Sequence, residues 1–463
     1  MNLRKHAENA SIVVANHALL LADMKMENST LGEYKYLVID EAHNLMASAS
    51  KHLGADLSYA DVVSLFNQLC ASHRKQKSGF LSNLQKALEK SVLSEKKKEQ
   101  AALEANRLEQ LIDAQRKPVI DMFNLANARC IAADSYNKLR IKDVNDAKDL
   151  FDLLACFADD FKEIMKSVQA LHNILSSFDG KQLPSYDALH ESLSAFVMRL
   201  SEMEEVLLQL LNPDLDNYAM WIENNPKPDR NIPSAVLNYA PIEVSGHLNR
   251  MLYNCVPSIV FTSATLALRG SFRYFVSQSG LGLLVDKGLS EVIVESPFDY
   301  DKQSKLLITS FLPEPKDRYF QNQAIECLEQ VIDTAEVGTM ALFTSYRDLD
   351  AVYERIAERL FNKKRPFFAQ GKGGSRSSIL EEFKTKNNGV LLGTSSFWEG
   401  VDVQGDSLSF LILYKIPFQV PSEPIVEAYI DKLERDNKDS FMHYMLTNAL
   451  LRLRQGFGRL IRS

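Results

Sequence analysis

The sequence has few cysteines and no long apolar run. The five cysteines lie far apart, without a CxxC pair or a histidine at zinc-site spacing: Cys70, Cys130, Cys156, Cys255 and Cys327. No run of 18 apolar residues is present, and Met1 leads into a polar stretch that does not resemble a secretory signal. We therefore expect a cytoplasmic protein without a membrane anchor, whose thiols are reduced and buried.

The sequence also has no excess of positive charge. Its formal net charge is -7, whereas nucleic-acid-binding proteins usually carry a basic excess. This balance does not exclude nucleic acid, because cations can be confined to one groove of an otherwise acidic surface. A length of 463 residues exceeds what one hydrophobic core organises, so two or three domains are expected.

Glycine and proline are scarce between residues 55 and 179, where only Gly79 and Pro118 occur. These two residue types interrupt helices most often, so their scarcity predicts a helical block. Within it, apolar residues recur at steps of four, three and four, beside the charged residues 96–99: Ala101, Ala105, Leu108 and Ile112. A solvated amphipathic helix explains this pattern better than a dedicated binding surface.

On either side of this block the sequence is typical of an α/β protein. An apolar stretch at 12–15 precedes a helical run, and residues 36–40 form an apolar run that ends in acids, as a buried parallel strand does. A second strand is predicted at 258–262. Further strands are predicted at 292–294, 306–308, 339–343, 389–392 and 408–413, with helices near 321–334 and 349–360 between them. This alternation predicts a mainly parallel sheet.

The tetrapeptide Asp40-Glu41-Ala42-His43 directly follows the first of these strands. An aspartate in this position can hold Mg²⁺ through water, and the adjacent glutamate can orient or deprotonate the water that attacks a γ-phosphate. The alternative is a turn or helix start with a capping acid. The strand directly before it favours the nucleotide site.

Two other segments suit the same chemistry. Ser263 and Thr265 end the strand at 258–262, where their hydroxyls can relay hydrogen bonds between a nucleotide site and a neighbouring domain, or form a plain turn. Gln455, Arg459 and Arg462 lie near the end of a predicted helix. The two arginines, three residues apart, share a helical face and can reach a γ-phosphate, although cations also stabilise helix ends without a ligand.

Three polar segments are candidates for nucleic-acid contacts. Ser395 and Trp398 follow a strand, where a hydroxyl suits a phosphate and the indole suits a base, although such aromatics are more often core residues. In the same segment Asp402 can accept from a ribose hydroxyl. Thr344 and Ser345 repeat the pattern of strand then hydroxyl, and Asn16 with His17 is a weaker candidate; the alternative for both pairs is a helix cap.

The order of these motifs resembles the DinG and xeroderma pigmentosum group D family of superfamily 2 DNA helicases. The resemblance covers nearly the whole chain and includes Ser296-Pro297-Phe298 and Trp398-Glu399-Gly400. It implies an α/β protein with two RecA-like parallel-sheet domains, the first incomplete, and a large all-helical arch insertion. The implied boundaries are 1–54 and 236–285 for the first domain, 55–235 for the arch and 286–463 for the second domain.

The resemblance also implies a function and site roles. The function is ATP-dependent translocation on single-stranded or forked DNA, usually 5' to 3', by a monomer acting in repair or replication. ATP and Mg²⁺ would be the cofactors. Asp40 would hold the metal, Glu41 would act on the water, and Arg459 and Arg462 would be arginine fingers. The remaining nucleotide contacts would come from His43, Gly400, Asp402 and Gln455.

One motif of such a helicase is missing from the sequence. No GxxxxGK[ST] loop, whose amides and lysine cradle phosphates, is present; Gly180-Lys181 and Gly371-Lys372 lack the following hydroxyl residue. In the family this loop and any iron–sulfur cysteines lie upstream, so we expect an N-terminal truncation, and these five cysteines do not support a cluster. The alternative function is an ATPase-deficient fragment that acts as a single-stranded nucleic-acid-binding module.

Overall fold

The computed structural model describes most of the chain. The described residues are 10–25, 31–73, 76–133, 137–225, 232–284, 288–296, 298–394, 397, 407–458 and 460. The chain divides into two compact units. Unit 1 comprises Met1–Tyr34, Leu45–Cys255 and Pro421–Lys432, and unit 2 comprises Lys35–Asn44, Val256–Val420 and Leu433–Ser463.

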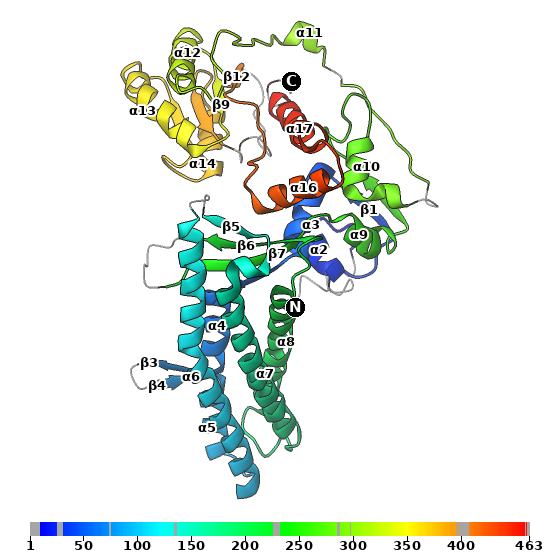
Figure 1. Ribbon diagram of the computed structural model, residues 1–463, viewed down its shortest axis with the longest axis vertical. Helices are drawn as coiled ribbons and strands as arrows, with labels where there is room; N and C mark the ends of the chain where they lie inside the picture. Colours follow the sequence, from blue (N-terminus) through cyan, green and yellow to red (C-terminus); the bar gives the residue numbers. More distant parts are fainter. Residues whose placement is uncertain are drawn as a thin grey trace. The chain divides into compact units, whose positions relative to one another are not determined.

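Unit 1 is built around long helices that lie alongside one another (Figure 1). Its principal helices are α4 (Tyr59–Leu69), α5 (Phe80–Glu89), α6 (Glu95–Ala132), α7 (Lys148–Ser176) and α8 (Tyr186–Leu211). The predicted apolar face of α6 is confirmed, because Ala101, Leu108 and Ile112 are all buried in one core with residues of α7 and α8. Shorter helices complete the unit: α2 (His17–Lys25), α3 (Leu45–Leu53), α9 (Ser245–Leu248) and the π-helical turn η3 (Asn249–Tyr253).

The region predicted to be an all-helical insertion also contains an antiparallel sheet, and to this extent the prediction was wrong. Its strands, in the order β2-β7-β6-β5, are β2 (Ala55–Ser58), β7 (Ala235–Pro241), β6 (Tyr218–Asn224) and β5 (Lys138–Ile141). One face, with Leu57, Ile141, Ile222 and Leu237, is buried against the helical core. β2 and β5 are short and pair with strands far along the chain, so a pattern read within a local window does not reveal their pairing. A small hairpin of β3 (Ala71–His73) and β4 (Gln76–Ser78) precedes α5.

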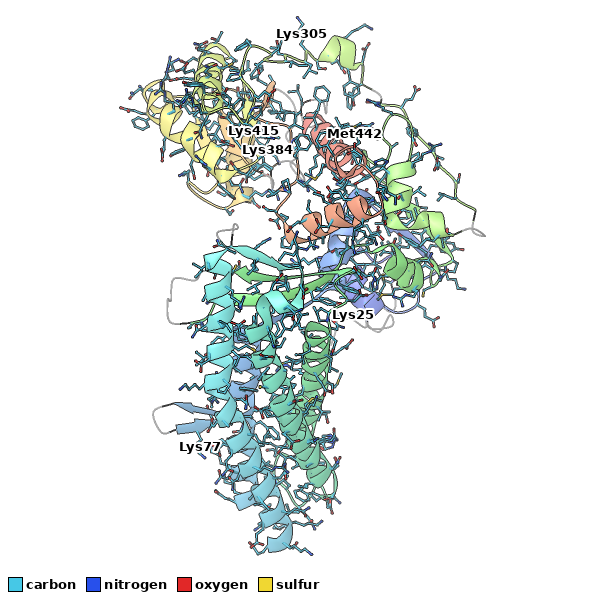
Figure 2. The ribbon with its side chains drawn as sticks, viewed as in Figure 1. Lys25, Lys77, Lys305, Lys384, Lys415 and Met442 are labelled. Atoms are coloured by element: carbon cyan, nitrogen blue, oxygen red, sulfur yellow. The ribbon has the colours of Figure 1, made fainter. Side chains whose placement is uncertain are left out.

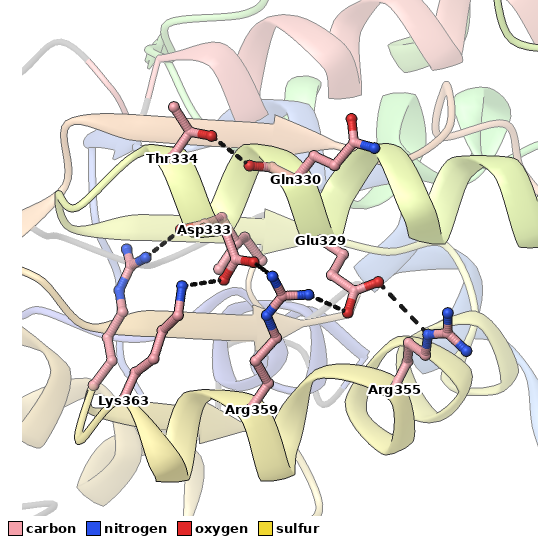
Figure 3. Close-up of polar contacts among 9 residues, drawn as sticks. Glu329, Gln330, Asp333, Thr334, Arg355, Arg359 and Lys363 are labelled. Carbon is pink, nitrogen blue, oxygen red and sulfur yellow. Dashed lines mark hydrogen bonds and ion pairs between the residues drawn. The ribbon is translucent and has the colours of Figure 1, made fainter.

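Unit 2 contains the predicted parallel sheet. Its strand order is β10-β11-β9-β12, formed by β10 (Phe367–Ala369), β11 (Val390–Gly393), β9 (Thr339–Leu342) and β12 (Phe410–Leu413). β9 and β11 are buried throughout, as central parallel strands are. The sheet packs with α12 (Phe320–Thr334), α13 (Tyr346–Asn362) and α14 (Arg376–Lys384). Ion pairs join α12 to α13, where Glu329 and Asp333 face Arg355, Arg359 and Lys363 (Figure 3).

Unit 2 also contains a two-stranded parallel sheet. β1 (Tyr36–Ile39) pairs in register with β8 (Ser258–Phe261), so Ile39 lies beside Phe261. Other helical elements of this unit are α10 (Arg273–Ser279), α11 (Tyr300–Gln303), the π-helical turn η6 (Phe441–Met445) and α17 (Leu446–Phe457). Helix α16 (Pro424–Arg435) begins in the segment that belongs to unit 1.

Two of the predicted strands are not strands, and neither is the apolar stretch at 12–15. Residues 12–15, 292–294 and 306–308 have no regular secondary structure, and Val14, Val294 and Ile308 are largely exposed. A short apolar run becomes a strand only where a neighbour completes its hydrogen bonds, and these runs pair with no strand in the described part of the chain.

The cysteines were predicted to be buried, and this is wrong for two of them. Cys70 and Cys130 are buried, and burial raises the pKa of both thiols, whereas Cys156 and Cys255 are exposed. None of the described helices is long and apolar enough to span a membrane.

Candidate functional site

The Asp-Glu-Ala-His tetrapeptide begins where β1 ends, at the carboxyl edge of its sheet. Glu41 has a φ of 48°, in the left-handed region that residues other than glycine seldom adopt. The chain then turns into the short 3₁₀ helix η1 (Ala42–Asn44), and the Ala42 amide donates to the carbonyl of Thr262 at 3.0 Å. Backbone strain of this kind is concentrated at functional sites.

Side chains from the two strand ends meet at Ser263. His43 Nδ1 lies 2.7 Å from Ser263 Oγ and 3.3 Å from Glu41 Oε2. The Ser263 hydroxyl also lies 3.3 Å from Glu41 Oε2, within reach for donation. The predicted hydroxyl relay residue is therefore in direct contact with the predicted water-orienting carboxylate.

The contacts continue from Ser263 to α17. Ser263 Oγ lies 3.3 Å from Thr265 Oγ1, and Gln455 Nε2 donates to Thr265 Oγ1 at 3.1 Å. Gln455 Oε1 is buried and has no hydrogen-bond partner among the described residues. A polar atom in this state favours a ligand that can donate to it. The structure thus brings together Glu41, His43, Ser263, Thr265 and Gln455.

A second group of polar residues lies at the carboxyl ends of the larger parallel sheet. Ser345 caps α13, because its hydroxyl accepts from the Asp348 amide at 3.1 Å and donates to Asp348 Oδ2 at 2.9 Å. Thr344 beside it is exposed. For Thr344 and Ser345, the alternative prediction of a helix cap is therefore confirmed at Ser345.

Lys415 is a site residue that the sequence reading missed. Lys415, labelled in Figure 2, follows Tyr414 just after the end of β12. Its Nζ lies 2.9 Å from Asp348 Oδ2. Burial, and secondarily the charge of Asp348, raises the pKa of Tyr414 to about 12. A lysine two residues after the apolar run 408–413 was the available signal, since an acid at the end of an apolar run identified Asp40.

Gln370, at the end of β10, was also missed. Its Oε1 accepts from both the amide and the hydroxyl of Thr394, at 2.8 and 2.9 Å, and its Nε2 donates to the Tyr346 hydroxyl at 2.6 Å. These bonds fix the position of Thr394, the residue directly before Ser395.

The remaining predicted residues fall into two groups. Asn16 caps α2, since its Oδ1 accepts from the Leu19 amide at 2.8 Å, and His17 is the first residue of that helix in unit 1. The others lie outside the described residues: Ser395, Trp398, Gly400, Asp402, Arg459 and Arg462.

Gly393, at the end of β11, is in close contact with Phe397. A Cβ added to it would lie 2.7 Å from Cγ of the fully buried Phe397 ring. Gly393→Ala should therefore displace that ring and lower the free energy of unfolding by about 1–3 kcal/mol. Urea titration measures the change. Gly373→Ala, where nothing lies within 4 Å of the added atom, is the control, and equal midpoints for the two variants would contradict the prediction.

The chain is similar to several known proteins. Residues 328–463 match the helicase C-terminal domain family. The chain is 28% identical over 468 residues to the Bacillus subtilis 3'-5' exonuclease DinG, covering 99% of this chain and 49% of that protein. It is 28% identical over 464 residues to the Haemophilus influenzae ATP-dependent DNA helicase YoaA, covering 99% of this chain and 63% of that protein.

The chain thus spans about half to two thirds of the length of these relatives. Among solved structures, that of S. tokodaii Xpd4 aligns with 96% of this chain and 74% of its own, at 14% identity and a TM-score of 0.45. Over nearly its whole length the chain is similar to the DinG and YoaA proteins, and its residues 328–463 match the helicase C-terminal domain family.

Proposed function

We propose that this chain is the larger part of the motor of an ATP-dependent DNA helicase, which couples ATP hydrolysis to movement along single-stranded DNA. The observation that carries the proposal is the unbroken series of contacts from Glu41 through Ser263 and Thr265 to Gln455. It links three segments that in a helicase must respond together to one nucleotide.

Glu41 acts on the attacking water. Its carboxylate orients that water and accepts its proton, while Ser263 and His43 hold the carboxylate from one side. The exposed Asp40 directly before it suits Mg²⁺, which would neutralise phosphate charge when bound as Mg-ATP. Gln455 Oε1, which has no partner among the described residues, supports this assignment, because a nucleotide or its bound water can donate to it.

Thr265 and Ser263 serve as the coupling residues. Because Thr265 bonds both to Ser263 and to Gln455 of α17, a shift of Glu41 when phosphate leaves would alter the hydrogen bonds of that helix. We further propose Arg459 and Arg462 as arginine fingers and Gly400 and Asp402 as nucleotide contacts.

The nucleic-acid contacts are assigned to polar residues on several segments. Thr344, Ser345 and Lys415 lie at the carboxyl edge of the larger sheet, and Ser395, Trp398, Asn16 and His17 complete the proposed set. We propose 5' to 3' movement of a monomer on single-stranded or forked DNA, in the cytoplasm, in repair or replication. The proposed domains are 1–54 with 236–285, the arch 55–235, and 286–463.

A second function is favoured by one observation. The sequence contains no GxxxxGK[ST] loop, so this chain would hold the triphosphate with fewer groups than a complete motor has. In that case the two units bind single-stranded nucleic acid without turnover.

ATP hydrolysis stimulated by single-stranded DNA separates the two functions. If the chain is a motor, phosphate release from Mg-ATP should rise when an oligothymidylate is added and remain low with blunt duplex of equal nucleotide content. Tight binding of the oligonucleotide without any phosphate release would instead establish the binding module and overturn the enzymatic function for this chain.

A further inference from the structure

The outer face of the antiparallel sheet in unit 1 carries a row of cations. Alternation along β5 turns Ile141 toward the helical core and places Lys138 and Arg140 on the opposite face, where Lys142 continues the row. In the pairing of β5 with β6, Arg140 lies opposite Trp221, and in the next pairing Trp221 lies opposite Asn238. Cross-strand partners share a face, so the row has an aromatic ring beside it.

Helix α16, together with Glu423 directly before it, covers this row with acids at matching intervals. Lys138 Nζ lies 2.8 Å from Glu423, Arg140 lies 2.7 Å from Asp431, and Lys142 Nζ lies 2.6 Å from Glu427 and 3.3 Å from Asp431. The acids are four residues apart, which spaces them by about 6 Å along the helix. The cations are two residues apart, or about 6.7 Å along the strand.

The same interval suits a nucleic-acid backbone. Two amino-acid residues and one nucleotide contain the same number of backbone bonds, so an extended single strand presents phosphates at nearly the spacing of these cations. The Trp221 ring beside Arg140 supplies a surface on which a base can stack. Basic residues interleaved with an aromatic are the combination that binds single strands without sequence preference.

The ion pairs between these acids and the row of cations are weak enough for another anion to replace the acids. The side chains of Glu423, Glu427 and Asp431 are 44%, 30% and 36% exposed, and pairs this accessible are weakened by solvent and salt. Arg140, by contrast, is only 10% exposed beneath them. Displacing the acids would therefore uncover a cation that already faces outward from the sheet.

We propose that Lys138, Arg140 and Lys142 bind the backbone of single-stranded DNA, and that the acids of α16 occupy this site as a mimic of that backbone until DNA displaces them. The identity of the ligand rests on the proposed function. The contact is autoinhibitory, because α16 lowers the affinity of the chain for DNA. Trp221 lies beside the bound strand.

Neutralising the acids tests the competition. The triple variant Glu423→Gln/Glu427→Gln/Asp431→Asn should bind a fluorescent oligothymidylate about tenfold more tightly than wild type. The dependence of log affinity on log salt should steepen by about 2, the value for three additional phosphate contacts on a single strand. Fluorescence anisotropy at several salt concentrations measures both, and circular dichroism verifies the fold.

The matched control is Glu95→Gln/Asp159→Asn/Glu163→Gln. It changes the net charge equally and releases Lys98, Lys162 and Lys166 from ion pairs that lie on helices without this register. Equal affinities for the two triple variants would overturn the proposal. If wild type binds the oligonucleotide in that case, the proposed function survives; if none of the proteins binds it, both fail.

Trp221 provides a second readout that does not depend on the acidic variants. The chain has two tryptophans, Trp221 and Trp398, so subtracting the emission of Trp221→Phe from that of wild type isolates the fluorescence of Trp221. Its fluorescence should be quenched when a saturating oligothymidylate binds, and the quenching should disappear with Lys138→Gln/Lys142→Gln added. Binding by anisotropy without any change in Trp221 emission would overturn the proposal.

Discussion

Replacing Glu41 by glutamine should lower the DNA-stimulated rate of ATP hydrolysis by about 10²- to 10⁴-fold, the usual contribution of a positioned general base. Glutamine keeps the size of the side chain and can still bond with Ser263, but it cannot accept a proton from water. Affinity for the oligonucleotide should stay unchanged, because Glu41 lies at the nucleotide end of the series of contacts. Steady-state phosphate release with saturating oligothymidylate measures the effect on turnover.

Glu33→Gln is the matched control for that experiment. Glu33 is an exposed glutamate shortly before β1, so it undergoes the same chemical change outside the site. Its rate should equal that of wild type. Unchanged hydrolysis in Glu41→Gln would remove Glu41 from the mechanism, and an equal loss in Glu33→Gln would show that the effect is not specific to the site.

Replacing Arg365 by methionine should lower the free energy of unfolding of unit 2 by about 3–5 kcal/mol. Arg365 is buried beside the larger sheet, and burial lowers the pKa of its guanidinium. It donates to the carbonyls of Asn388 and Val337, both at 2.7 Å, and to that of Ile332. Methionine fills similar volume but leaves these acceptors without their donor.

Urea titration followed by circular dichroism, with hydrogen exchange at β9 and β11, measures this loss. Lys364→Met is the control, because Lys364 is the exposed neighbour of Arg365 and should be nearly neutral. Arg365→Lys should fall between the two, since an ammonium reaches fewer of the three carbonyls. A midpoint for Arg365→Met equal to that of Lys364→Met would mean that the carbonyls find other donors.

The fold was predictable where local pattern and burial coincide. β9 and β11 lie in continuous apolar runs and form buried parallel strands as predicted. β1 is also a parallel strand, but its predicted burial is wrong, because only Ile39 of its four residues is buried. The same pattern at 306–308 was misleading, because pairing depends on a neighbour that a local window does not contain. The antiparallel sheet was missed for the converse reason: β2 and β5 each pair with strands far along the chain.

The residues of the candidate site could be predicted from their positions after strands or near a helix end. The hydrogen bonds that join them could not. Glu41, Ser263 and Gln455 were each singled out, and the structure joins them through Thr265. The contact of His43 with Ser263 could not be predicted, because it depends on how the chain turns after the left-handed Glu41. Gln370 was missed because it belongs to no recognisable motif and its partners, Tyr346 and Thr394, are each 24 positions away in the sequence.

The pairing of β1 with β8 has a consequence for synthesis of the protein. Glu41 and Ser263, which follow these strands, are 222 positions apart, so β1 leaves the ribosome long before its partner exists. At about 5–20 residues per second, that interval lasts roughly 10–45 s. Helices of unit 1 can fold during this time, whereas β1 still lacks β8, its partner among the described strands. Chaperones that bind nascent chains therefore have a defined period in which to protect the region around Asp40, and slow translation of the inserted segment would lengthen it.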